Sequence, residues 1–80
     1  MKALITVHLK PGISDPEGKN TEKALHLLGF DAVAGVHTTK IWEIELTGIA
    51  AADAKAQAEQ MCKRLLTNPV IHTYSIEVRE

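Results

Sequence analysis

The chain contains several side chains that could bind a metal ion, above all four histidines. A protein zinc site gathers four ligands, mostly His and Cys at short spacings along the chain. No histidine here forms such a close sequence pair with another histidine or with Cys62. The histidines are His8, His26, His37 and His72, and they fall on different predicted elements. Because these positions do not converge, we interpret them as ordinary surface or sheet residues and expect no metal site.

Nucleophilic chemistry would have to come from Cys62, the single cysteine of the chain. A reactive thiol needs a basic neighbour that lowers its pKa, but Lys63 and Arg64 face away from Cys62 on the predicted helix. Cys62 follows Met61, a predicted core residue, so we interpret it as a small core residue too. One cysteine cannot form an internal disulfide. Together with the lack of a predicted secretory signal, this favours a reducing, cytoplasmic location.

The carboxylates and glycines show no pattern of a catalytic or phosphate-binding site. Isolated carboxylates usually lie on solvated faces, and the glycines are too dispersed to cradle a phosphate. Lys40, near a predicted turn, could bind an anion, but a solvated turn lysine is the simpler interpretation. We therefore expect the chain to have no active site of its own. The carboxylates considered are Asp15, Glu43, Glu45 and Glu59.

Size and charge limit the classes of function. Eighty residues should form one domain over residues 1–80, and a core of this size supplies as little as about 3–5 kcal/mol. Such chains often depend on oligomerisation or on a partner. Nine basic and ten acidic residues are mixed along the chain, with one Trp, one Tyr and one Phe, which argues against nucleic-acid binding. No stretch is long and apolar enough to span a membrane.

The first half of the chain predicts a strand and then a helix. Apolar residues alternate from Lys2 to Lys10, as in a half-buried strand. Asp15 followed by Pro16 suits an N-cap with proline at the first helical position. The helix should end at Leu28-Gly29-Phe30, where Gly29 can take the left-handed conformation.

The second half predicts two strands, a helix and a last strand. Residues Ala32 to Thr47 are long enough for two strands, joined by a turn at Thr38-Thr39-Lys40. A helix over Gly48 to Asn68 follows, and the last strand runs from Val70 to Arg79. The joint between them is short because Pro69 cannot continue a helix.

Helical spacing assigns the inner face of this second helix. Ala54 and Ala58 are followed by Met61 and Leu65 on one stripe. The small alanines should allow a close approach of the helix to a sheet.

This order of elements predicts an α+β chain with a ferredoxin-like βαββαβ fold. We expect a four-stranded antiparallel sheet with both helices on one face. The first and third strands should then be central and the last strand an edge. The face without helices would be mostly polar. Few charges protect the edge strand before Glu77, so we predict dimerisation or partner docking along it.

Two runs of residues resemble a known family. The first is Asp15-Pro16-Glu17-Gly18 with the later Leu28-Gly29-Phe30. The second, and more specific, has Met61-Cys62 before Leu65-Leu66, then Asn68-Pro69-Val70-Ile71 and Tyr74. Together they resemble the PurS family, the small subunit of phosphoribosylformylglycinamidine (FGAM) synthase, over nearly the whole chain.

The resemblance implies an assembly role in the fourth step of de novo purine biosynthesis. The family's subunit is non-catalytic and bridges the glutaminase PurQ and the synthetase PurL, aiding ammonia transfer. PurL uses ATP and magnesium to convert formylglycinamide ribonucleotide (FGAR) to FGAM. The resemblance therefore implies no cofactor on this chain, with ATP and Mg²⁺ on PurL. It also implies a homodimer or a higher homo-oligomer.

The family motifs give a predicted partner interface, with two departures from the family pattern. At the expected hairpin the family often has Val-Arg-x-Gly-Lys, whereas this chain has His37 and Thr39 at the Arg and Gly positions. The family also often has Glu at the position of His72, so we predict that this contact is sensitive to pH. The predicted interface residues are Asp15, Pro16, Gly18, Lys40, Asn68, Pro69, His72 and Tyr74.

A second function class fits the predicted fold. A small-molecule-sensing module of the ACT type is also ferredoxin-like, carries its ligand at a dimer interface, and would use Lys10-Pro11-Gly12 after the first strand. A sensing module should gain thermal stability from an amino acid or a nucleotide, whereas an assembly subunit should not.

Overall fold

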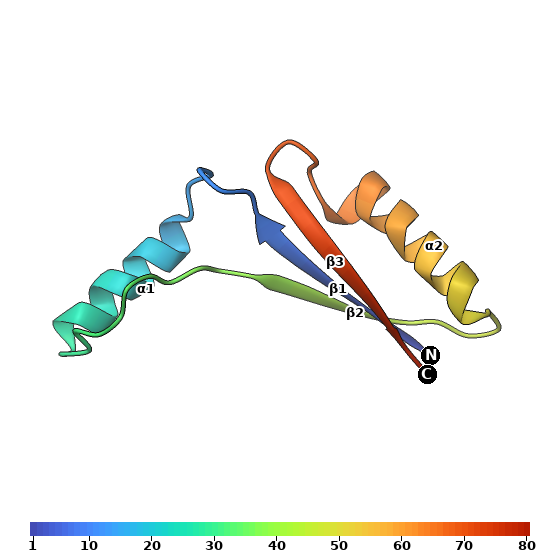
Figure 1. The fold of residues 1–80 in the computed structure, drawn as a ribbon, viewed down its shortest axis with the longest axis horizontal. Helices are drawn as coiled ribbons and strands as arrows, with labels where there is room; N and C mark the ends of the chain where they lie inside the picture. Colours follow the sequence, from blue (N-terminus) through green and yellow to red (C-terminus); the bar gives the residue numbers. More distant parts are fainter.

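The structure, a computed structural model, describes residues 1–80. Its sheet has three strands: β1 (Lys2–Leu9), β2 (Lys40–Glu45) and β3 (His72–Arg79). The strand order is β2-β1-β3, and both pairings are antiparallel (Figure 1). The register places Ile5 of the central strand opposite Trp42 on one side and Ile76 on the other.

One helix, α2 (Ala51–Met61), covers one face of this sheet. Alternate residues of β1 point at α2, and small side chains on α2 allow the close approach that the sequence predicts. The predicted inner positions Ala54 and Ala58 are fully buried. The core consists of six apolar residues, from β1 and from α2 with its extension: Ala3, Ile5, Val7, Ala54, Ala58 and Cys62.

The helix α2 continues into a five-residue π-helical turn, Cys62–Leu66. The backbone N–H and the hydroxyl of Thr67 both donate to the carbonyl of Cys62, at 3.0 and 2.9 Å. A π turn holds more residues than an α turn, so the side chains after Met61 are rotated from their α-helical positions. Leu65 is 83% exposed, and its predicted place on the inner face is wrong.

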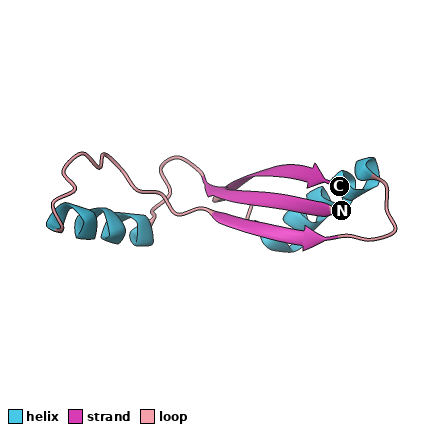
Figure 2. Cartoon of the chain, turned by 90° about the horizontal axis from the view of Figure 1, so that it is seen from below, coloured by secondary structure: helices cyan, strands magenta, loops and turns pink.

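The helix α1 (Pro16–Leu27) lies beyond the end of the sheet and does not cover it. Residues 28–39 run back beside it toward β2 (Figures 1 and 2). We call α1 together with residues 28–39 the arm. The arm makes the molecule long and thin, with extents of 50 × 27 × 14 Å. The expectation of two helices on one sheet face is therefore wrong.

The predicted four-stranded sheet is also wrong, because Val33 to Thr38 forms no strand. The backbone groups at the two ends of this segment bond within the arm and its base. The carbonyl of Val33 lies 2.8 Å from Nε2 of His26, and the N–H of Thr38 donates to Asp15. No hairpin turn forms at Thr38–Lys40, and the predicted central strand β2 is an edge. The last strand, β3, is an edge as predicted.

The predicted ends of the first helix are confirmed. Asp15 is the N-cap of α1 and Pro16 its first residue. Gly29 has a φ of 95°, the left-handed conformation expected after the helix. Neither helix combines the length and apolar character needed to cross a lipid bilayer.

Candidate functional site

Asp15 joins the two chain segments at the base of the arm. One carboxylate oxygen accepts a hydrogen bond from the N–H of Thr38, at 2.7 Å, and the other accepts from the N–H of Gly18, at 2.9 Å. The bond from Thr38, followed by that from Gly18, lowers the pKa of the Asp15 carboxyl, because both favour its charged form. Thr38 is 23 residues away in sequence, so this second role goes beyond the helix cap predicted for Asp15.

Gly18 makes the contact between α1 and the returning segment possible. It is buried, and a Cβ at this position would lie 2.4 Å from the backbone carbonyl oxygen of Val36. Real Cβ atoms do not approach a carbonyl so closely, so any other residue here would force the backbone to shift. The Asp-Pro-x-Gly run is therefore explained by the base of the arm: a cap, a helix start and a close backbone contact.

Four of the predicted interface residues line one hollow of about 280 Å³ between the base of the arm and the sheet. They are Asp15, Pro16, Lys40 and His72. In the sheet register, Lys40 and Tyr74 both lie opposite Val7. Tyr74 packs against the core, and Gly18 is buried. The structure thus brings half of the predicted set together and places Gly18 and Tyr74 in supporting positions.

The joint between α2 and β3 contains the rest of the predicted set. The side-chain oxygen of Asn68 accepts from the N–H of Val70, at 3.0 Å, and the N–H of Asn68 donates to Nδ1 of His72, at 2.9 Å. Lys10 donates to the carbonyl of Pro69, at 2.6 Å. His72 therefore supports the joint through its ring. The predicted pH sensitivity of a partner contact at His72 stays a prediction.

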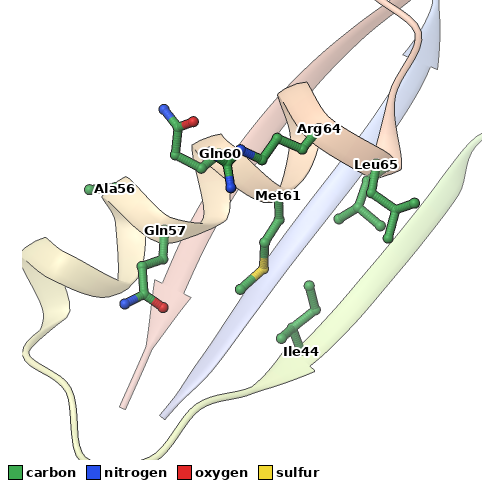
Figure 3. A pocket seen from close by; sticks show the side chains of 8 residues that line it. Ile44, Ala56, Gln57, Gln60, Met61, Arg64 and Leu65 are labelled. Atoms are coloured by element: carbon green, nitrogen blue, oxygen red, sulfur yellow. The ribbon is translucent and has the colours of Figure 1, made fainter.

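An apolar groove of about 590 Å³ runs beside α2, between the helix and β2 (Figure 3). Met61 and Ile44 point toward one another across it, from the helix and from the strand. Leu65 and Leu66 extend its apolar lining, and Arg64 lies at its side. Helical spacing predicted Met61 and Leu65 as core residues, so the groove was not predicted. The groove could have been predicted from the apolar stripe along this helix, because the stripe is longer than the sheet that covers it.

The remaining reactive groups are engaged or dispersed. Cys62 is buried as predicted, and burial, with a smaller effect of Glu59, raises the pKa of its thiol. Glu43 pairs with Lys2 and Glu77 pairs with Arg79 on the surface. The structure has no group of three or more His, Cys, Asp or Glu side chains placed to hold a metal ion.

Comparison with known proteins decides the family. The family model named PurS, described as phosphoribosylformylglycinamidine (FGAM) synthase, matches residues 2–80. The chain belongs to the PurS family. A PurS subunit from Archaeoglobus fulgidus is 45% identical over 80 residues, which cover all of both chains.

The PurS fold is also shared with solved structures. The crystal structure of PurS from Methanocaldococcus jannaschii is 42% identical and has a TM-score of 0.90, with 99% of this chain and 95% of that chain covered. A match of that quality over 99% of the chain includes the arm, so the extended shape is common to both PurS chains. A chain of the PurLQS structure from Thermotoga maritima has the same fold, with a TM-score of 0.73 at 24% identity, covering 95% of this chain and 93% of that chain.

Proposed function

We propose that this chain is the small, non-catalytic subunit of FGAM synthase, where it assembles with the synthetase PurL and the glutaminase PurQ. The observation that carries the proposal is the full-length match to the PurS family. The similar M. jannaschii PurS is described as one of the subunits of formylglycinamide ribonucleotide amidotransferase in the purine biosynthetic pathway. The reaction consumes FGAR, ATP and glutamine and yields FGAM, in the cytoplasm.

In this proposal the chemistry belongs to the partners, and the chain aids ammonia transfer by holding PurL and PurQ together. The carboxylates support this role, because Asp15 is a helix cap and Glu43 and Glu77 belong to surface ion pairs. ATP and Mg²⁺ would be held by PurL, and no cofactor by this chain. The hollow lined by Asp15, Lys40 and His72 is the surface we assign to partner contact.

The shape of the chain supports a role in assembly. Its radius of gyration is 16.1 Å, against about 12 Å for a compact domain of this length. Its accessible surface is 5916 Å², roughly 1,200 Å² more than a compact monomer of this mass exposes. A standard interface covers about 800 Å² on each partner. The excess is therefore large enough for an interface, and we propose that the subunit is at least a homodimer.

The observed fold does not support the alternative of an ACT-type sensing module. It required a four-stranded sheet with both helices on one face, whereas the chain forms three strands and one covering helix. No observation favours it over the assembly role.

Co-purification tests the proposal directly. Tagged PurL, mixed with PurQ and this chain in the presence of glutamine and ADP, should retain both on an affinity column. PurL and PurQ without this chain are the matched control and should associate much less. Retention of PurQ that is independent of this chain would contradict the bridging role.

A further inference from the structure

The joint between α2 and β3 contains a set of hydrogen bonds centred on Asn68. Its carbonyl accepts from the N–H groups of Ile71 and His72, at 3.1 and 2.8 Å. Its side-chain oxygen accepts from the N–H of Val70, at 3.0 Å. Its own N–H donates to Nδ1 of the His72 ring, at 2.9 Å. One imidazole nitrogen is therefore part of the backbone bonding of the joint.

The bond from Asn68 determines the protonation state of His72. A backbone N–H can only donate, so Nδ1 accepts with its lone pair and carries no proton. In a neutral imidazole the proton then lies on Nε2, whereas an imidazolium donates from both nitrogens. Protonation of Nδ1 would set two donors against each other. A charged ring must therefore turn away and leave the N–H of Asn68 without this partner.

The ring of His72 also lines the hollow at the base of the arm, together with charged groups from other elements. Glu17 contributes a carboxylate from the first turn of α1, and Lys40 contributes an ammonium from the start of β2. Asp15 adds a second carboxylate, whose oxygens already accept from two backbone N–H groups. Glu17 takes part in no ion pair within the chain.

Lys10 completes the charged surroundings of the ring on the side of the joint. Its Nζ donates to the carbonyl of Pro69, at 2.6 Å. Tyr74, the next side chain on the same face of β3, packs against the core. The two lysines, Lys10 and Lys40, disfavour a charged imidazole, whereas the carboxylates of the hollow favour it. Glu17 is the unpaired carboxylate among them, so it is the group available to a charged ring.

We infer that His72 is a pH-dependent switch between the joint and the base of the arm. The neutral ring accepts from the N–H of Asn68 and closes the joint. The protonated ring leaves that N–H and pairs with Glu17 across the hollow. A histidine ordinarily changes charge near about pH 6.5, so both states are reached under mild conditions. The switch belongs to the single chain and is tested without PurL or PurQ.

NMR spectroscopy of the chain follows both sides of the switch. The ring signals of His72 report its charge, and the amide signal of Asn68 reports the hydrogen bond. Between about pH 8 and pH 5, we expect the two to move with the same midpoint. The protection of the Asn68 amide against hydrogen exchange, corrected for the intrinsic rate at each pH, should fall about 2- to 12-fold, the range for one hydrogen bond.

His72→Asn is the matched variant for the joint. Its side-chain oxygen can take the place of Nδ1 as an acceptor but cannot titrate, so the amide signal of Asn68 should stay constant over the same range. His8→Asn is the control, because His8 is exposed and does not line the hollow. This control should keep the transition of the parent.

Glu17→Gln tests the other end of the switch. Removal of the carboxylate charge takes away the partner of the protonated ring, so protonation should require a lower pH. We expect the midpoint of the His72 titration to fall by about 0.2–0.7 pH units, the range for an exposed ion pair.

The outcomes that would overturn the switch are distinct. A ring of His72 that titrates while the Asn68 amide stays constant would show that protonation does not open the joint. An amide transition that persists in His72→Asn would assign it to another group. An unchanged midpoint in Glu17→Gln would remove the exchange between the joint and the arm. None of these results bears on association with PurL and PurQ, so the proposed function is tested separately.

Discussion

Asp15 shows how far single residues can be interpreted from sequence. Its helix-capping role follows from the next residue being Pro16 and from the three-residue spacing to Gly18. Its hydrogen bond to Thr38 does not, because that partner depends on where the chain returns after 23 residues. The returning segment also explains Gly18. Glycine is a poor helix former, but the backbone of Val36 lies so close to this position that a Cβ would clash with it.

At Gly18 two opposing effects make the outcome of substitution informative. Alanine in a helix interior is favoured over glycine by about 1 kcal/mol. The added Cβ, however, would meet the backbone oxygen of Val36 at 2.4 Å. We predict that Gly18→Ala lowers the free energy of unfolding by about 1–3 kcal/mol, as overpacking does. Urea denaturation measures it, and a stabilised variant would show that the arm is not tightly packed at its base.

The base of the arm should respond to acid. The pKa of Asp15 is lowered in the folded chain, so on acidification the unfolded chain takes up the proton first. The stabilisation is present above the ordinary carboxyl value, about pH 4, and is lost as the pH falls through the lower folded pKa. We predict that the amide signals of Gly18 and Thr38 move together in an NMR titration below about pH 4.

Asp15→Asn is the matched control for this titration. An asparagine keeps one carbonyl oxygen for a helix cap but cannot titrate, so the acid transition of the Gly18 and Thr38 amides should disappear. If the transition persists in Asp15→Asn, another carboxyl controls the base of the arm.

At the scale of elements, periodicity predicted both helices and the first and last strands correctly. It gave wrong predictions where contacts between distant parts of the chain determine the structure. The segment Val33 to Thr38 is β-prone in part, but it forms no ladder, and its ends bond to His26 of α1 and to Asp15. The groove was missed for a related reason. The helical stripe did not show that α2 continues into a π turn or that Leu65 is exposed.

The contact between α2 and β1 depends on small side chains. Ala58 is fully buried against the core, so a larger residue would push the helix off the sheet. We predict that Ala58→Leu costs about 1–3 kcal/mol of stability and that Ala52→Leu, on the exposed side of the same helix, costs less than about 0.5 kcal/mol. Thermal unfolding of both variants compares them. Equal effects would contradict the close packing of α2 on the sheet.

At the scale of the whole molecule, the chain is extended and has a small core. Seven of its 80 residues are buried, and the arm adds length without adding to the core. The chain has an apolar groove beside α2 and a hollow at the base of the arm. An open shape of this kind suits a subunit that is completed by other chains.

Reconstitution of FGAM formation tests the role of this chain in joining PurL and PurQ. PurL and PurQ would be assayed with FGAR, ATP and Mg²⁺, with and without this chain, using glutamine or ammonium chloride as the nitrogen source. We predict that adding the chain strongly raises glutamine-dependent FGAM formation and leaves ammonia-dependent formation nearly unchanged. Equal glutamine-dependent rates with and without the chain would contradict it.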